Sequence, residues 1–295
     1  MDLRQLEYFV AVAEEGGFTA AAARVHISQS GVSAQVRQLE RELGAELIDR
    51  SGRRATLTAA GAAALEHAHA ALAAAGAVRR AVDDVNGVVR GRLEVGMVVG
   101  CTITPLFDAL AAFHRSHPGV ELSIVEDGSD RLVERVRNGT TDLALIGVAG
   151  RAPVGLESAT IVTEPIVALV APDHPLAGRT RATLAQVAAQ PVVGLPTGTG
   201  IRAAFDQACV AHGVAADVAL EASSPDAVAD LAARGFGAAI LAASMAGGYD
   251  RLHPVAISDA TVPALLAFAW RATGSPALRA LLAHAHEAFG LARAA

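Results

Sequence analysis

The first part of the chain carries three short stretches in which apolar residues recur at helical spacing. The first is predicted to be a helix over residues 3–15, because Asp2 suits the N-cap and two glycines follow the last turn. A second short helix is predicted over 19–25. Ser28 then suits the cap of a third helix over 29–43, which a glycine ends. Three helices with a tight turn before the last are typical of a helix-turn-helix unit.

The third predicted helix has two different faces. Its apolar residues form one stripe that is expected to face the core, made of Val32, Val36, Leu39 and Leu43. Small, polar and basic residues fall nearly opposite, namely Ser30, Ser33, Ala34, Arg37 and Arg41. Near the helix start this second face is short and uncharged, as suits a helix that enters the DNA major groove with its N-terminal end first.

A short hairpin is predicted directly after this unit. Strand-like pieces over 47–50 and 55–57 flank a Ser-Gly turn, and Arg50, Arg53 and Arg54 lie close to that turn. Residues 50–54 thus hold three arginines and no acidic residue, so positive charge is concentrated at the hairpin tip. Such a tip, called a wing, suits phosphate or minor-groove contact. A solvated turn without a function is the alternative.

A long alanine-rich helix is predicted from Thr58 to about Val89. Val78, Val82 and further apolar residues repeat at a three-four spacing along it and form a narrow apolar seam. A helix of this length cannot bury such a seam alone, so pairing with a second copy of the chain is expected. Packing of the seam on the chain's own C-terminal part is the alternative.

From about residue 91 the pattern changes to alternating strands and helices. The first set reads RLEVGMV, VELSIVE and DLALIG as strands, with PLFDALAAFHRSHPG and SDRLVERVRNG as helices between them. A second set runs from EPIVALVAP to GAAIL, and the chain closes with the strand LLAFAW and a helix from Pro276 to about Ala292. Such βαβ units imply parallel sheets with right-handed crossovers. The predicted fold class is α/β, with two lobes and a ligand cleft at the carboxyl ends of the strands.

Composition narrows the classes of partner. The sequence has no lysine, so its 24 basic residues are all arginines, and 30 acidic residues give a net charge of −6. This net charge argues against bulk attraction to nucleic acid, so any DNA contact has to come from local placement of charge.

The apolar content does not predict a membrane protein. Hydrophobic residues make up 52% and the mean hydropathy is +0.38, but much of this is alanine, and no apolar run approaches the roughly 20 residues that span a membrane. The start of the chain, MDLRQLEYFV, is acidic where a signal peptide is basic. We therefore expect a cytoplasmic protein without membrane association.

The stretch MDLRQLEYFVAVAEEGGFTAAAARVHISQSGVSAQVRQLERELGAELIDR, followed by RATLTAAG, closely resembles the winged helix-turn-helix of LysR-type transcriptional regulators. More loosely, HPGVELSIVEDGSDRLVERVRNGTTDLALIG and SSPDAVADLAARGFGAAIL resemble the family's effector domain, which looks like a periplasmic binding protein. The resemblance implies a winged helix-turn-helix DNA-binding domain over 1–58, a dimerisation linker helix over 59–90 and an effector-binding domain over 91–295. The lobes of the last domain are expected to comprise 91–161 plus 267–295, and 162–266.

The resemblance further implies a sequence-specific DNA-binding regulator rather than an enzyme. Such regulators are usually dimers of dimers that respond to a small molecule. The expected partners are double-stranded operator DNA, an effector, further copies in a homodimer or homotetramer, and RNA polymerase, while the direction of regulation stays open. By similarity, base edges are approached by Gln29, Ser30 and Ser33, and phosphates or the minor groove are held by Arg37, Arg53 and Arg54.

Two positions of the third helix depart from the family pattern. Proline commonly follows the Ser-Gln pair, whereas this chain has Ser30, whose hydroxyl suits the first helical turn and is able to bond a base or phosphate. A basic or polar residue is frequent where Ala34 stands. Base readout by this helix is therefore expected to be weaker, or to shift to a thymine methyl group, which alanine suits.

The expected cleft is formed by loops that follow strands. These loops contribute Gly100, Cys101, Thr102, Ser129 and Gly147 from the first lobe, and Pro196, Thr197 and Thr199 from the second. The last three belong to LPTGTGIR, where a helix begins, and free amides at a helix start favour an anion. A small carboxylate is therefore the expected effector. A loop that merely turns the chain is the alternative.

Two other classes of function are compatible with parts of the sequence. The two-lobed part alone would fit a solute-binding protein, but the helix-turn-helix pattern argues against that class. A catalytic or metal cluster would use His114, His117, Asp127 and Asp130, although both histidines lie at a helix end, where solvated roles are commoner.

The two cysteines support little chemistry. Cys101 lies in the expected cleft, where a redox-sensing thiol is conceivable, but Cys209 falls in a predicted helix of the other lobe. The sequence shows no zinc-ligand spacing, so we expect neither a metal nor another cofactor.

Overall fold

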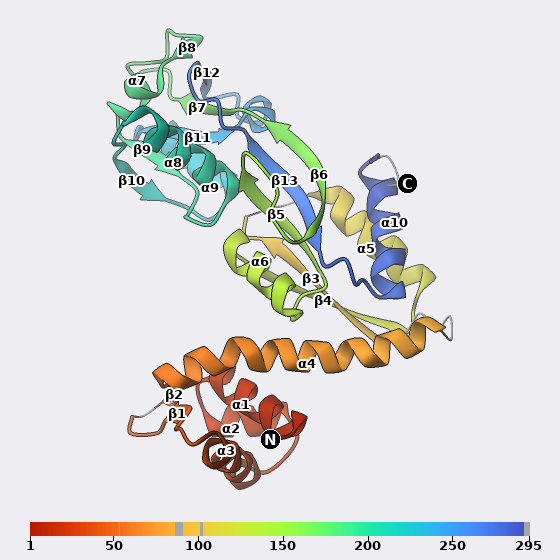
Figure 1. Cartoon of the computed structure of the whole chain (residues 1–295). Coiled ribbons are helices and arrows are strands. Elements are labelled where there is room, and N and C mark those ends of the chain that lie inside the picture. Colours follow the sequence, from red (N-terminus) through yellow and green to blue (C-terminus); the bar gives the residue numbers. More distant parts are fainter. Residues whose placement is uncertain (53, 86–90, 101–102, 292–295) are drawn as a thin grey trace. The chain divides into compact units, whose positions relative to one another are not determined.

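The computed structural model describes residues 1–295 except 53, 86–90, 101–102 and 292–295 (Figure 1). The chain forms two compact units. One consists mainly of Met1–Val88, and the other of Val89–Arg137 and Thr141–Ala295. Among the helices of the described residues, none combines the length and the apolar character needed to span a lipid bilayer.

The first unit is a bundle of helices with a small hairpin. Its elements are α1 (Leu3–Glu15), α2 (Phe18–Arg24), α3 (Gln29–Leu43), the strands β1 (Ile48–Asp49) and β2 (Thr56–Leu57), and α4 (Ala59–Val85). The Asp2 carboxylate accepts from the Gln5 amide, and the Gln5 side chain accepts from the Asp2 amide, so α1 begins with a capping box. Gly16 and Gly44 end α1 and α3 in the left-handed conformation. The three predicted helices are thus confirmed to within a residue.

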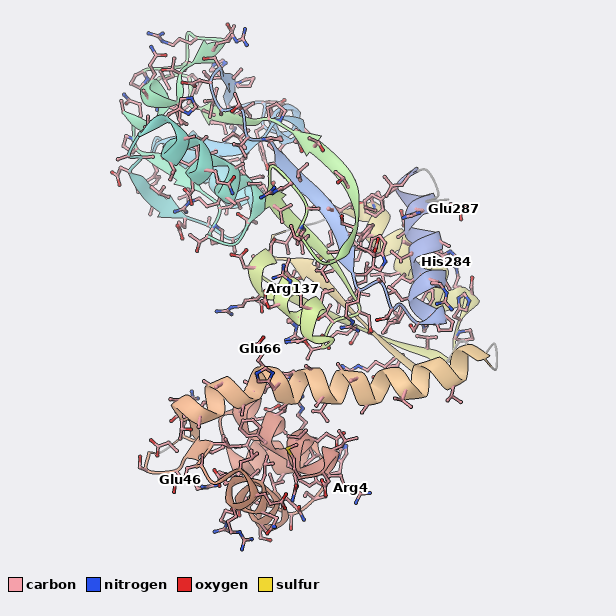
Figure 2. All side chains as sticks on the ribbon, viewed as in Figure 1. Arg4, Glu46, Glu66, Arg137, His284 and Glu287 are labelled. Atoms are coloured by element: carbon pink, nitrogen blue, oxygen red, sulfur yellow. The ribbon has the colours of Figure 1, made fainter. Side chains whose placement is uncertain are left out.

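Apolar side chains of these helices form one core. Phe9, Val12, Val32, Val36 and Leu39 are fully buried. The first half of α4 closes the core, while the exposed Glu66 projects from α4 away from α1–α3 (Figure 2).

Some details of this unit differ from the sequence-based expectation. Leu43 is exposed, because α3 ends there and its last turn leaves the core stripe. The wing strands are only two residues long each. The predicted extension of the long helix to Val89, and its boundary at 90, lie outside the described residues.

The second unit contains two sheets with helices on both faces. The first sheet has the order β4-β3-β5-β13-β6. Its strands are β3 (Gly91–Val98), β4 (Val120–Asp127), β5 (Leu143–Ala149), β6 (Glu157–Glu164) and β13 (Ala264–Trp270). Helices α5 (Thr104–Ser116) and α10 (Pro276–Ala288) pack on one face, and α6 (Ser129–Asn138) packs on the other (Figure 1).

The second sheet has the order β10-β9-β11-β7-β12-β8. Its strands are β7 (Ile166–Val170), β8 (Arg181–Ala182), β9 (Val192–Gly194), β10 (Val218–Glu221), β11 (Ala238–Ala242) and β12 (His253–Ile257). Helices α7 (Leu184–Ala188) and α8 (Gly200–His212) pack on one face. The other face carries α9 (Pro225–Ala233) and the short helix η1 (Ala243–Gly248).

Both sheets are mixed rather than purely parallel, which corrects the sequence-based expectation. The strand β3 runs parallel to β4 and β5, but β13 runs antiparallel to β5 and β6. In the second sheet β7 is antiparallel to β11 and β12. The antiparallel strands β7 and β13 are those with which the chain enters the second sheet and returns to the first. The right-handed crossover rule applies to parallel strands joined within one sheet, so it does not fix the direction of a strand that arrives from the other lobe.

The same crossings decide where the lobes divide. The divisions expected at 161/162 and 266/267 cut through β6 and β13, and both strands belong wholly to the first sheet. The last helix ends at Ala288, before the expected Ala292.

Candidate DNA-binding surface and ligand cleft

The N-terminal end of α3 forms an exposed tip. His26, with φ 55°, turns the chain before the helix, and the Ser28 hydroxyl accepts from the Gly31 amide at 3.1 Å to cap it. Gln29 and Ser30 are exposed, and Ser33 is half-buried. These polar side chains are therefore presented by a helix whose opposite stripe is held in the core.

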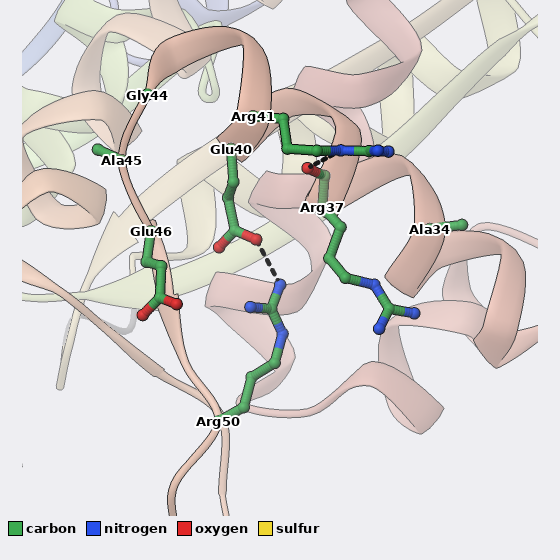
Figure 3. Close-up of a pocket in the computed structure, with 8 residues that line it drawn as sticks. All are labelled: Ala34, Arg37, Glu40, Arg41, Gly44, Ala45, Glu46 and Arg50. Carbon is green, nitrogen blue, oxygen red and sulfur yellow. Dashed lines mark hydrogen bonds and ion pairs between the residues drawn. The ribbon is translucent and has the colours of Figure 1, made fainter.

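Two arginines of this region have unengaged guanidinium groups. Arg37 on α3 and Arg54 in the wing are exposed, and among the described residues neither guanidinium makes a hydrogen bond or ion pair. Arg41 differs, because its Nε donates to the Arg37 carbonyl at 3.3 Å and its guanidinium to the Gln38 side chain at 2.6 Å. Arg37 extends freely from the same surface (Figure 3). The predicted contact residue Arg53 lies outside the described residues.

Arg50 has a different role from the other wing arginines. Its guanidinium donates to Glu40 at 2.6 Å and lies over the ring of Phe18, 5.3 Å from the centroid (Figure 3). Glu40 is 7% exposed and also accepts from the backbone amides of Leu47, at 2.9 Å, and Ile48, at 3.1 Å. Its place near the turn suggested that Arg50 is free to contact DNA. In the structure Arg50 instead anchors the wing to α3.

The electrostatics of Glu40 agree with this anchoring role. Burial alone would raise the pKa of Glu40, but the hydrogen bonds from Arg50 and from the amides of Ile48 and Leu47 outweigh burial and leave the pKa below its ordinary value of 4.5. The carboxylate is thus the form that holds β1 against α3.

A cleft of about 450 Å³ lies between the two sheets of the second unit. Three of the expected effector residues, Gly100, Gly147 and Thr199, line it. Its apolar wall includes Val98, Ile103, Val162, Leu195, Ile201, Met245 and Leu266. Cys101 and Thr102, which were also expected there, lie outside the described residues.

Ser129, another expected effector residue, joins the lobes instead of lining the cleft. The buried Ser129 donates its amide to the Gly198 carbonyl at 2.7 Å, and its hydroxyl accepts from the Gly147 amide at 2.9 Å. Ser129, Pro196 and Thr197 are absent from the described cleft lining.

The hydroxyl of Thr199 is also engaged within its own turn. It donates to the Pro196 carbonyl at 2.9 Å, and Thr199 is buried. The polar groups of the turn before α8 therefore form hydrogen bonds within the turn and with the first lobe.

Five polar residues of the cleft were not predicted from the sequence, namely Glu164, Ser224, Asp226, Ser244 and Tyr249. Glu164 ends β6 and accepts from the Ser244 amide at 2.7 Å and from the Ser244 hydroxyl at 2.9 Å. Asp226, in the first turn of α9, accepts from the Tyr249 hydroxyl at 2.8 Å. Burial, together with this bond and the charge of Asp226, raises the pKa of Tyr249 to about 12. The acidic residue after a strand-like ESATIVT was an available signal, but the partners lie too far apart in sequence to pair by pattern.

Two family models cover most of the chain. "Bacterial regulatory helix-turn-helix protein, lysR family" matches residues 3–62, and "LysR substrate binding domain" matches residues 86–290. The chain belongs to the LysR family of bacterial transcriptional regulators.

Individual LysR-type relatives agree with this assignment. The RuBisCO operon transcriptional regulator of Allochromatium vinosum is 35% identical over 208 residues, which cover 70% of this chain and 68% of that protein. The regulator ShiR of Corynebacterium glutamicum is 35% identical over 245 residues, covering 81% of this chain and 82% of ShiR.

Solved structures of full-length LysR-type regulators show the same fold. An OxyR variant from Pseudomonas aeruginosa matches with a TM-score of 0.70 and 27% identity, over 99% of this chain and 96% of OxyR. CbnR, a LysR family transcriptional regulator, matches with a TM-score of 0.59 and 28% identity, over 98% of this chain and 99% of CbnR. This LysR-type protein is thus a DNA-binding regulator with an effector-binding domain, and its family is not one of enzymes.

Two residues of the candidate catalytic or metal cluster, His117 and Asp127, make contacts within the protein. The His117 ring stacks on Phe113 with 4.8 Å between centroids, and Asp127 accepts from the Gly128 amide and pairs with Arg131. In the described residues no group of three or more His, Cys, Asp or Glu side chains is arranged to hold a metal ion.

Proposed function

We propose that this regulator reads operator DNA with the tip of α3 and grips the flanking backbone with Arg37 and the wing. In this assignment base edges are approached by Gln29, Ser30 and Ser33, while phosphates or the minor groove are held by Arg37, Arg53 and Arg54. The exposed polar tip of α3, opposite a buried stripe, is the observation that carries the proposal. CbnR has also been solved in complex with its target DNA, with 28% identity and a TM-score of 0.58 to this chain.

A matched pair of glutamines on α3 tests base contact. Gln29→Ala is expected to lower affinity for the operator by about 1–3 kcal/mol, the usual value of a good base contact. Gln35 is exposed on another face of the same helix, so Gln35→Ala is the control. Fluorescence anisotropy with duplexes from the protein's own promoter region measures both. Equal affinities of the two variants would remove Gln29 from the interface.

The free guanidinium of Arg37 tests phosphate contact. Arg37→Ala is expected to weaken specific and nonspecific duplexes alike and to reduce the slope of log affinity against log salt by about one. Binding isotherms at several salt concentrations give this slope. An unchanged slope would show that Arg37 does not neutralise a phosphate.

We further propose that a small molecule in the cleft controls a homodimer or homotetramer of this chain, and that RNA polymerase is the downstream partner. The segments 1–58, 59–90 and 91–295 would then serve DNA binding, self-association and effector response. The cleft volume lies within the range of small-molecule sites, which supports the effector role. Thermal-shift screening of the full-length protein, followed by operator binding with each stabilising compound, tests this. Stabilisers that leave operator affinity unchanged would contradict it.

A peroxide-sensing variant of this function receives no support from Cys209. A relative from Mycobacterium avium, named a probable hydrogen peroxide-inducible genes activator, is 35% identical over 214 residues. Cys209 is buried in α8, and burial together with the charge of Asp206 raises the pKa of the Cys209 thiol, although Arg202 opposes this. A reactive thiol needs the opposite environment.

A further inference from the structure

The ligand cleft has an unbalanced set of polar side chains. Two carboxylates, Glu164 and Asp226, line it together with the hydroxyls of Thr199, Ser224, Ser244 and Tyr249. Three of these four hydroxyls already donate their proton: Thr199 to a carbonyl of its own turn at 2.9 Å, Ser244 to Glu164 at 2.9 Å and Tyr249 to Asp226 at 2.8 Å. The fourth, of Ser224, accepts from the Ala227 amide at 3.3 Å. Most of the described side chains that could donate a hydrogen bond to a ligand therefore already donate within the protein.

Acceptor capacity remains on the carboxylates. A carboxylate offers about four lone-pair sites. Glu164 accepts from the amide and the hydroxyl of Ser244, and Asp226 accepts from Tyr249. Further sites on both side chains can receive donors from a ligand, and both side chains bring negative charge.

Among the described residues that line the cleft, no positive charge balances these carboxylates. Among the described lining residues none is an arginine or a histidine, and the whole sequence lacks lysine. Arg202 lies on α8, whose first turn reaches the cleft, but it is mostly buried and already bonded to Asp206 and Glu221. An anion would therefore enter an acidic site without a counter-charge, which is costly at low dielectric.

The start of α8 is a poor anion cradle despite its free amides. The strand β5 comes so close that a Cβ atom on Gly147 would lie 2.8 Å from the Gly200 nitrogen, and one on Gly200 would lie 2.5 Å from the Val148 nitrogen. The backbone of β5 thus covers the first amide of the helix. The first of the amides that favoured a carboxylate effector in the sequence is therefore covered by the protein itself.

We infer that the cleft takes an amphipathic amine, with an ammonium or amidinium head toward Glu164 and Asp226 and a small apolar body against the wall. That wall includes Val98, Val162, Leu195, Ile201 and Leu266. The inference rests on the proposed effector role of the cleft and names the chemical class of its ligand.

Matched probes that differ only in the head group test this class. Isothermal titration calorimetry of the full-length protein would compare benzylamine with benzoate, and 3-methylbutylamine with 3-methylbutanoate. The amine of each pair is expected to bind at least about tenfold more tightly, a difference of ~1.4 kcal/mol. Tighter binding of the carboxylates, or no binding of either amine at millimolar concentration, overturns the inference.

Charge-removing variants locate the head group. Glu164→Gln and Asp226→Asn keep the shape of each side chain and are each expected to lower amine affinity about tenfold. The controls are Glu157→Gln, exposed on the same strand as Glu164, and Asp230→Asn, on the same helix as Asp226 and paired with Arg234 at 2.7 Å. Equal losses in the controls and the cleft variants overturn the placement.

A separate readout distinguishes the ligand class from the proposed function. Operator affinity is measured with and without saturating amine, and a change that disappears in Glu164→Gln supports both. Amine binding that depends on Glu164 and Asp226 but leaves operator affinity unchanged supports the ligand class and contradicts the effector role.

Discussion

At the residue scale, a single buried carboxylate organises the DNA-binding unit. Glu40 lies on α3 and points toward the wing, where it accepts hydrogen bonds from two backbone amides and from the guanidinium of Arg50. A buried amide that loses its hydrogen-bond acceptor destabilises the folded state by the full free energy of its desolvation. The orientation of the wing against α3 therefore depends on this one side chain.

Removal of the Glu40 carboxylate is expected to destabilise the first unit. Glu40→Ala leaves the amides of Leu47 and Ile48 unsatisfied and should lower the free energy of unfolding by about 2–4 kcal/mol. Calorimetry of the full-length protein measures the change. The control Glu42→Ala removes an exposed carboxylate of the same helix and should alter stability by less than about 0.5 kcal/mol. Equal effects of the two would refute the anchoring role.

The lowered pKa of Glu40 also predicts a dependence on pH. Because the folded pKa lies below the ordinary value of 4.5, the folded state binds fewer protons than the unfolded chain in this range. The stabilisation is present above pH 4.5 and is lost as pH falls through the folded pKa. Unfolding measured in steps from about pH 6 to pH 3 should show a smaller acid loss for Glu40→Gln than for the wild type. Parallel curves would contradict this.

At the element scale, α8 acts as a joint between the lobes of the second unit. Its N-terminal turn touches β5 so closely that glycine is needed on both sides, at Gly147 and Gly200. The amide of Ser129 reaches the carbonyl of Gly198 in the same turn. This contact holds together the part of the cleft lined by Gly147 and Gly200. It also explains why Ser129, which was expected to bind a ligand, bonds to the backbone instead.

A methyl group at this joint is expected to separate the elements. Gly200→Ala places its Cβ against the backbone of β5, so the second unit should lose about 2 kcal/mol or more of stability. Trp270, the one tryptophan of the sequence, lies in β13 beside β5 and reports unfolding of this unit by fluorescence. Gly194→Ala is the control, since a Cβ atom added at Gly194 would lie 3.9 Å from its nearest neighbour, a side-chain carbon of Val218. A fully stable Gly200→Ala protein would show that the close approach is not required.

At the scale of the whole molecule, self-association is proposed to use α4. Val78 and Val82 are 68% and 57% exposed, one helical turn apart. Exposed valines at this spacing form a seam that a second helix can cover.

Charge on the α4 seam is expected to weaken the assembly. Val78→Asp combined with Val82→Asp should shift the protein from an oligomer toward the monomer at micromolar concentration, because it would place carboxylates in an apolar interface. Analytical ultracentrifugation measures the shift. Val154, which is 77% exposed in the second unit, gives the control Val154→Asp. An unchanged oligomer in the double variant would place the interface elsewhere.

The sequence by itself determined the elements whose hydrogen bonds are local. Asp2 caps α1 through an amide three residues away, and Ser28 caps α3 in the same way. The glycines after α1 and α3, and the stripe Val32, Val36 and Leu39, follow from backbone freedom and helical period. The helix-turn-helix and the parallel core of the first sheet were therefore predictable.

Only the tertiary structure decided which distant groups meet. Arg50 finds Glu40 across ten positions, Asp226 finds Tyr249 across 23, and Glu164 finds Ser244 across 80. The sequence pattern gives the period of each element but not the direction in which a chain returns from another lobe, so the antiparallel strands and the acidic cleft could not be foreseen. Partners that are far apart in sequence become neighbours only when burial of the two cores fixes the sheets that carry them.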